Sequence, residues 1–288
     1  MHYTISHALV YEYSQPVVLD THILRLCPWT DWRQTLKSYA LQILPSPDRQ
    51  VQVADLDGNT VKHLYFSSTP LSKLQIQMQA RVETHCENPF DFLLSRWAAQ
   101  LPLDYPSTLK TQLSPYLHTN GSTLAAAFDP HASTLAQTLA HETNGNVVMF
   151  LCELNQRINT ECAYVIRETG APQLPGITWS QKSGSCRDYV MLFIEVCRAV
   201  GLAARFVSGY HEGDPDTDEF HLHAWAEVYL PGAGWRGFDP TLGLAVGDRH
   251  VALAASPFPS YAAPFSGKLQ AGSRAESKMS YQLSISSP

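Results

Sequence analysis

The chain has 288 residues, a formal net charge of −6 and 44% hydrophobic residues. This length suits two domains, and the composition is that of a soluble globular protein. The negative charge argues against a nucleic-acid or anionic-membrane partner, and no apolar run is long enough to span a bilayer. The first residues lack the features of a signal peptide, and the six cysteines form no Cys-x-x-Cys pair. These features predict free thiols in a reducing cytoplasm.

Residues 1–85 have the pattern of a β-rich domain. Apolar and polar residues alternate at 39–43 and at 74–82, and Asp57-Gly58-Asn59 is a hairpin-type turn. Several short strands at this spacing predict a β-sandwich or a partly open barrel. No residue of this region is expected to carry chemistry.

Residues 86–288 are predicted to form the second domain of an α+β protein, with a core at about 146–250. The Pro-bearing segment 86–145 predicts short helices and loops. Asn146 is expected to cap a helix, because apolar residues recur behind it at helical spacing. Near the C-terminus, residues 279–285 alternate like a strand and are expected to pair with one of the sheets.

Cys186 is expected to begin a buried helix. Ser185 and Asp188 have the spacing of a capping box, and apolar residues follow at helical spacing up to Gly201, a natural C-terminal stop. Free N–H groups and the helix dipole favour an anion at this position, so they stabilise a thiolate. A cysteine considered alone is more often structural, and Cys197 on the apolar stripe of the same helix fits that alternative.

A predicted hairpin carries His223 on one strand and Asp239 on the other. A turn centred on Pro231 would place the two residues directly opposite each other on one face, whereas a four-residue loop would put Asp239 on the other face. Gly232 and Gly234 permit the bulge that decides between these registers. Considered alone, the histidine would be a half-buried structural residue and the Asp-Pro pair a turn opener.

Four motifs occur in order along the second domain. They are Gly184-Ser185-Cys186-Arg187-Asp188-Tyr189, Ser208-Gly209-Tyr210, His223-Ala224-Trp225-Ala226-Glu227-Val228-Tyr229 and Gly234-Trp235-Arg236-Gly237-Phe238-Asp239-Pro240-Thr241. Together they resemble the transglutaminase-like superfamily of papain-like Cys-His-Asp enzymes, in its bacterial branch with an N-terminal β-domain. Ser185 stands where that family usually has valine. The resemblance implies that Cys186 is the nucleophile, His223 the base and Asp239 the orienting acid.

The resemblance also implies a fold in which the cysteine-bearing helix packs on an antiparallel sheet that carries the histidine and the aspartate. The thiolate would attack an amide or ester carbonyl, and water or an amine would then take the acyl group from the thioester. The backbone N–H of Cys186 is one expected oxyanion donor, and the side chain of Gln181 or Trp179 is a second. Residues expected to line the cleft are Trp225, Trp235 and Tyr210.

The favoured function is therefore a cysteine peptidase or amidase that acts on a peptide or protein without cofactor or metal. The alternatives are a protein-glutamine transglutaminase and an inactive peptide-binding module. A metal site of His221, His223 and Cys186 is disfavoured, because no second cysteine is positioned beside Cys186. The acidic segment 211–220 resembles a calcium loop but lacks the ligand register of an EF-hand, so a solvated loop is the favoured interpretation.

Overall fold

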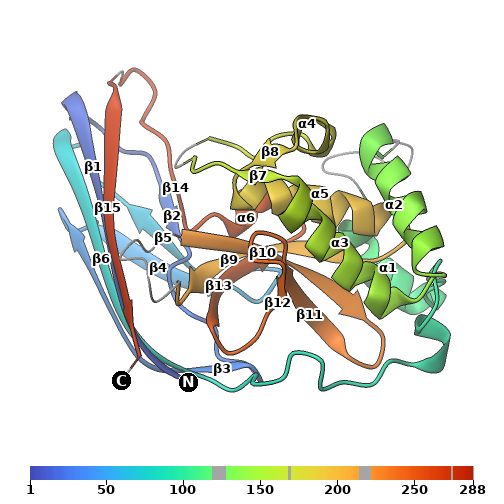
Figure 1. The fold of residues 1–288 in the computed structure, drawn as a ribbon. Helices are drawn as coiled ribbons and strands as arrows, with labels where there is room; N and C mark the ends of the chain where they lie inside the picture. The colour runs from blue at the N-terminus through green and yellow to red at the C-terminus, as the bar shows by residue number, and fades with distance from the viewer. Residues whose placement is uncertain (119–127, 168–169, 214–221, 274, 288) are drawn as a thin grey trace.

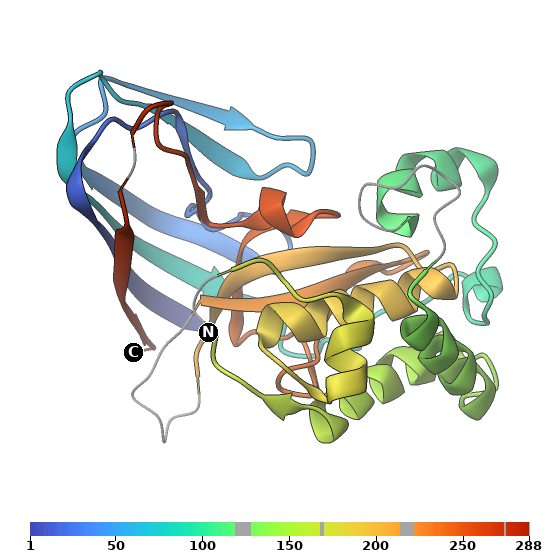
Figure 2. The same cartoon turned by 90° about the horizontal axis from the view of Figure 1, so that it is seen from above.

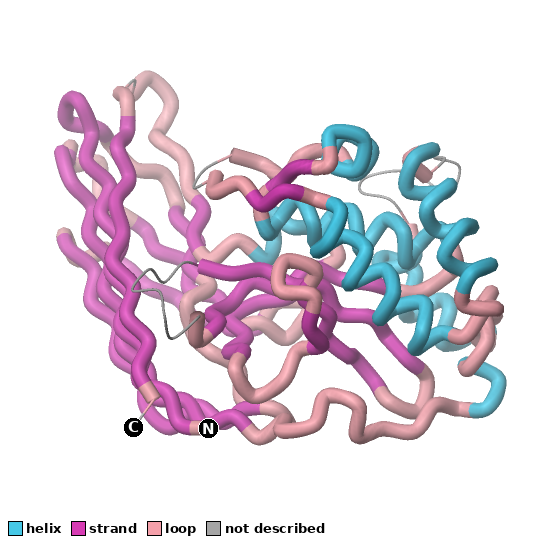
Figure 3. Tube along the Cα trace, viewed as in Figure 1, coloured by secondary structure: helices cyan, strands magenta, loops and turns pink. Residues whose placement is uncertain are grey.

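The computed structural model describes residues 1–118, 128–167, 170–213, 222–273 and 275–287. Two β-sheets that contain most of the N-terminal region lie beside a third sheet, which is covered by helices (Figure 1, Figure 3). This arrangement confirms the predicted α+β fold. None of the described helices is both long enough and apolar enough to cross a membrane.

The first sheet is antiparallel and has the strand order β15-β1-β6-β3. Its strands are β1 (His2–Val17), β3 (Gln34–Leu44), β6 (Leu71–Thr84) and β15 (Ser277–Ser286). Alternate residues of β6 are buried, as the alternation of the sequence predicts. The edge strand β15 comes from the far end of the chain and pairs with β1 along most of its length, so the two termini share one sheet.

The second sheet packs against the first and has the order β14-β2-β5-β4. Its strands are β2 (His22–Leu24), β4 (Arg49–Ala54), β5 (Thr60–Tyr65) and β14 (Phe265–Ser266). Leu24 and Leu64 of this sheet share a buried cluster with Ile5, Leu9 and Ile76 of the first. Burying two apolar faces against each other is what makes a sandwich stable.

The third sheet is five-stranded and antiparallel, in the order β12-β11-β10-β9-β13. Its strands are β9 (Ala204–His211), β10 (Leu222–Leu230), β11 (Gly234–Asp239), β12 (Leu244–Ala245) and β13 (His250–Ser256). Helices and a short parallel strand pair complete this region: η1 (Arg96–Ala98), α1 (Ser107–Leu117), α2 (Pro130–Glu142), α3 (Val147–Glu161), β7 (Ala163–Tyr164), α4 (Pro175–Gln181), β8 (Ser183–Gly184), α5 (Cys186–Ala199) and α6 (Pro259–Ala262). Helix α5 is buried over most of its length and shares the main apolar cluster with β9 and β10.

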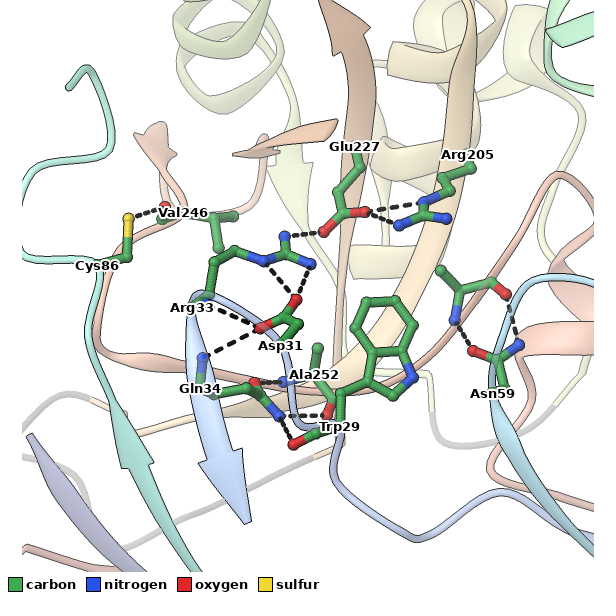
Figure 4. A network of polar contacts seen from close by, with 11 residues as sticks. Trp29, Asp31, Arg33, Gln34, Asn59, Cys86, Arg205, Glu227, Val246 and Ala252 are labelled. Carbon is green, nitrogen blue, oxygen red and sulfur yellow. Dashed lines mark hydrogen bonds and ion pairs between the residues drawn. The ribbon is translucent and has the colours of Figure 1, made fainter. Parts of the chain in front are cut away.

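A polar network joins the N-terminal region to the third sheet (Figure 4). The fully buried carboxylate of Glu227 on β10 accepts hydrogen bonds from Arg33, which precedes β3, and from Arg205 on β9. Gln34 and Asn59 each donate to one backbone carbonyl of β13 and accept from the N–H of the same residue. Because these polar atoms are buried, a substitution that removes one of them leaves its partner buried and unsatisfied, so the network specifies how the two regions pack.

Candidate active site

Helix α5 begins at Cys186, as the capping box predicts. The carboxylate of Asp188 accepts from the backbone N–H of Ser185 at 2.8 Å and from its hydroxyl at 2.7 Å. A Cβ on Gly184 would lie 2.8 Å from that of Asp188, so only glycine permits this close turn. Asp188 is fully buried, and Arg167 pairs with its other oxygen at 2.5 Å. The cysteine is therefore held at a fixed helix N-terminus.

The hairpin register places Asp239 on the same face as His223. The turn is centred on Gly232, one residue beyond Pro231, and both turn glycines have positive φ. The sequence left the register open, and the observed one differs from both alternatives: Asp239 shares the face of His223 but lies two residues along the strand, so it reaches His223 diagonally.

The resulting ion pair is short and buried. Nε2 of His223 lies 2.5 Å from Oδ2 of Asp239, whose Oδ1 accepts from the backbone N–H of Thr241 at 2.9 Å. Burial would lower the pKa of His223, but the charge of Asp239 and the hydrogen bonds to Asp239 and Cys186 outweigh it and raise the pKa to about 10. Burial would raise the pKa of Asp239, but the two neighbouring histidines hold it well below its usual range. The pair is therefore an imidazolium and a carboxylate at neutral pH.

His250 is a contact of this pair that the sequence motifs did not indicate. It begins β13, and its Nε2 lies 3.1 Å from the same oxygen of Asp239. Burial lowers the pKa of His250, so the neutral ring donates its Nε2 proton to the carboxylate. The ring of His211 lies 4.6 Å from that of His250 and 5.9 Å from that of His223. Position at the start of an apolar strand is the only sequence signal that could have pointed to His250.

In the described part of the chain, one cluster of side chains could hold a metal ion, and it consists of His223, Asp239 and His250. The ligand atoms of His223, Asp239 and His250 lie within 4.8 Å of one another. A metal needs the neutral imidazole, whereas the raised pKa of His223 favours its protonated form. His221, which the metal alternative also needs, lies outside the described residues, as does most of the acidic segment.

A cavity of about 600 Å³ opens onto the cysteine and the histidine. One part of it is lined by Cys186, His223, Tyr164, Arg167 and Arg187, and the N-terminal sheets and β15 line another. The charged residues among the described lining are arginines and the histidine, with no aspartate or glutamate.

The three residues predicted to line the cleft lie elsewhere. Trp225 is buried in the sheet, with its ring 5.2 Å from that of His250. Trp235 packs under the guanidinium of Arg205, whose Cζ lies 4.2 Å from the ring centroid. Tyr210 is fully buried against the N-terminal region, and its hydroxyl bonds Nδ1 of His7 at 2.9 Å. The prediction failed because aromatic residues of a buried sheet face its two packed layers rather than the cleft.

The predicted side-chain donors for the oxyanion also lie away from the cavity. Gln181 is exposed at the end of α4, and Trp179 packs on the main core beneath the ammonium of Lys182. Neither residue lines the cavity. Tyr164 on β7 does line it, as Cys186 and His223 do; no motif in the sequence marks this tyrosine.

Comparison with known proteins agrees with this arrangement. Residues 3–83 match the model of the bacterial transglutaminase-like N-terminal region, and residues 133–240 match that of the transglutaminase-like superfamily core. An uncharacterised protein of Mycobacterium tuberculosis is 27% identical over 265 residues, which cover 87% of this chain and 82% of the relative. A protein-glutamine gamma-glutamyltransferase of Pseudomonas aeruginosa is 32% identical over 127 residues, which are 41% of this chain and 19% of that enzyme.

Among solved structures, a Cytophaga hutchinsonii protein provisionally described as a cysteine protease superposes with a TM-score of 0.71. The match covers 100% of this chain and 91% of that one at 20% identity, which establishes a shared fold. The two family models cover successive parts of the chain, and their order is the one in which the β-rich region and the cysteine-bearing region follow each other. The chain therefore belongs to the transglutaminase-like superfamily.

Proposed function

We propose that this protein is a thiol-dependent acyl-transfer enzyme that hydrolyses amide bonds in peptides or proteins. The observation that carries the proposal is the buried His223–Asp239 ion pair, whose histidine lines the same cavity as Cys186 at the N-terminus of α5. Because Nε2 of the imidazole is bonded to Asp239, Nδ1 is the nitrogen left for the sulfur. A helix N-terminus and an imidazolium both stabilise a thiolate. In this proposal Cys186 is the nucleophile, His223 the acid and base, and Asp239 the orienting group.

The reaction follows from these positions. The thiolate of Cys186 attacks the carbonyl carbon, and the electron pair of the C=O bond moves to the oxygen. His223 gives its proton to the leaving amine as the tetrahedral intermediate collapses to a thioester. The neutral imidazole then takes a proton from water, and the resulting hydroxide attacks the thioester and releases the acid. Asp239 keeps the ring oriented and stabilises its charge throughout.

Tyr164 is the side chain that we assign as second oxyanion donor, in place of Gln181 and Trp179. Burial and the neighbouring Cys186 raise the pKa of its hydroxyl to about 12, so it keeps its proton at neutral pH. It lines the same cavity as Cys186 and His223, which puts a donor on the side of the cavity where the charge develops. The backbone N–H of Cys186 is the first donor in this assignment.

Two similar proteins bear on whether the acyl group goes to water or to an amine. One solved structure is provisionally described as a cysteine protease, and one relative is named a protein-glutamine gamma-glutamyltransferase. We favour hydrolysis because the protein described as a protease matches this chain over its whole length, whereas the match to the glutamyltransferase covers 41% of this chain and 19% of that enzyme. We also place the enzyme in a reducing compartment such as the cytoplasm, since all six cysteines are free thiols.

A product assay tests the proposal. A glutamine-containing peptide is incubated with the protein and a primary amine, and mass spectrometry scores cleavage, deamidation and amine incorporation. Hydrolysis products that vanish in Cys186→Ala and persist in Cys197→Ala support the proposal. Amine incorporation as the main product favours the transglutaminase alternative, and binding without any turnover favours the inactive peptide-binding module.

A further inference from the structure

The wall of the cavity that faces the cysteine comes from the two ends of the chain. Strand β1 supplies Leu9 and Tyr11, strand β15 supplies Met279 and Tyr281, and β14 supplies Phe265. Figure 2 shows these N-terminal sheets standing beside the helix-covered sheet. We call these five residues the apolar wall.

The apolar wall is fixed by strand pairing. In the register of β1 with β15, Tyr11 lies opposite Met279, and Leu9 lies opposite Tyr281. The two pairs are two positions apart along each strand, so all four side chains point to the same face of the sheet. The ring of Phe265 packs on that of Tyr11 with 4.9 Å between centroids. The surface is therefore preformed rather than assembled when a ligand arrives.

A peptide carbonyl at Cys186 would place its neighbouring side chains in this same cavity. The volume of about 600 Å³ exceeds the needs of the reacting atoms and lies in the range of pockets that hold a ligand. No charged residue stands on the apolar wall, whereas the arginines lie on the side of the cysteine. Burying an ammonium or a carboxylate against such a wall would cost free energy, and burying an aromatic ring would release it.

We infer that the apolar wall binds a large apolar side chain, aromatic or long aliphatic, of a peptide substrate next to the bond that Cys186 attacks. The inference rests on the proposed function and names its substrate class. It also gives β1 and β15 a role in recognition, although neither strand supplies a residue of the Cys-His-Asp constellation.

Binding to the Cys186→Ala protein tests the inference without turnover. The probes are N-acetylated, C-amidated hexa-alanine peptides in which one position at a time carries Phe, Leu, Lys or Glu, and affinities are measured by isothermal titration calorimetry. The best Phe or Leu peptide should bind at least about tenfold more tightly than its Ala, Lys and Glu counterparts, as expected for one buried apolar side chain.

Variants of β15 in the Cys186→Ala background locate the effect. Met279→Asp places a charge on the apolar wall and should abolish the preference, and Met279→Ala should weaken it. Leu283→Ala is the matched control, since Leu283 is half-buried on the same strand but does not line the cavity. Equal affinities for all peptides, or a preference that survives Met279→Asp, would overturn the inference.

Turnover of the same peptides by the unmodified protein separates the two proposals. Selective binding of apolar peptides that are never cleaved leaves the pocket standing and rejects the hydrolase. Cleavage without any side-chain preference rejects the pocket and leaves the hydrolase standing.

Discussion

A single carboxylate oxygen of Asp239 accepts from two histidines, His223 at 2.5 Å and His250 at 3.1 Å. The short contact belongs to the ring whose pKa is raised, and the longer one to the ring whose pKa burial lowers. A charged donor makes the stronger hydrogen bond, which explains this difference. The neutral His250 therefore helps to hold the carboxylate while His223 changes its protonation state.

Thiol reactivity gives the first residue-scale prediction. At pH 6, iodoacetamide should label Cys186 at least about tenfold faster than any other cysteine, because an ordinary thiol is scarcely ionised there. Burial raises the pKa of the five others: Cys27, Cys86, Cys152, Cys162 and Cys197. The variant His223→Ala should lose much of the preference because the counter-charge is gone. Mass spectrometry of labelled peptides measures this, and equal labelling of Cys186 and Cys197 would contradict it.

The second residue-scale prediction concerns Tyr164. Replacing it with phenylalanine keeps the ring but removes the hydroxyl, so kcat should fall by about 10²- to 10³-fold, as for the loss of one oxyanion donor. Iodoacetamide labelling of Cys186 should change much less, because alkylation forms no oxyanion. Trp179→Phe is the control, since this residue lies outside the cavity. A loss of turnover in Trp179→Phe equal to that in Tyr164→Phe would reject the assignment.

At the scale of single elements, the start of α5 depends on its cap. Ser185→Ala removes the hydroxyl that bonds Asp188 and should lower the free energy of unfolding by about 1 kcal/mol, the usual cost of a lost N-cap. Ser180→Ala, at an exposed position of α4, is the control and should stay within about 0.5 kcal/mol. Urea unfolding measures both variants. A Ser185→Ala protein as stable as the unmodified one would show that the cap is dispensable.

The same element shows how far the sequence could predict the site. The capping box was predictable because Ser185 and Asp188 are three residues apart, and the pairing of β10 with β11 because a glycine-containing turn joins them. The register remained open, since one residue in the turn decides which side chains face each other. Tyr164 and His250 were not predictable, because neither belongs to a recognised motif: Tyr164 lies on the two-residue strand β7, and His250 begins β13.

At the scale of the molecule, the N-terminal region is held to the third sheet by buried charge. Glu227 lies between Arg33 and Arg205, and all three are largely buried. Strand β15, near the C-terminus, also pairs with β1, near the N-terminus, so the two ends of the chain lie in one sheet. The alternation at residues 279–285 predicted a strand but not the strand with which it pairs. A period-two pattern specifies which face of a strand is buried, and not which strand lies beside it.

Glu227→Gln gives the whole-molecule prediction. It leaves the buried guanidinium of Arg205 beside a neutral amide, whereas Arg33 keeps its ion pair with Asp31, so the free energy of unfolding should fall by about 3–5 kcal/mol, as for one broken buried ion pair. Glu83→Gln, which breaks an exposed contact with Lys37, should cost much less than Glu227→Gln. Urea unfolding followed by tryptophan fluorescence and by circular dichroism compares them; a smaller loss for Glu227→Gln than for Glu83→Gln would contradict the role of the network.

The same network should depend on pH. Burial would raise the pKa of Glu227, but Arg33 and Arg205 outweigh it and hold the pKa below the ordinary value of 4.5. A carboxyl whose folded pKa is depressed stabilises the fold above its unfolded pKa and loses that contribution as the pH falls through the folded value. The stability difference between the unmodified protein and Glu227→Gln should therefore be full above about pH 5 and shrink in stronger acid.

The central claim is that Cys186 forms a thioester with the substrate acyl group. Mixing the protein with a p-nitrophenyl ester and quenching in acid within the first turnover should yield one acyl adduct, which peptide mass spectrometry places on Cys186. Cys186→Ala should give neither the adduct nor the burst of p-nitrophenol. Ester hydrolysis with no adduct on Cys186, or with the same burst in Cys186→Ala, would contradict the account.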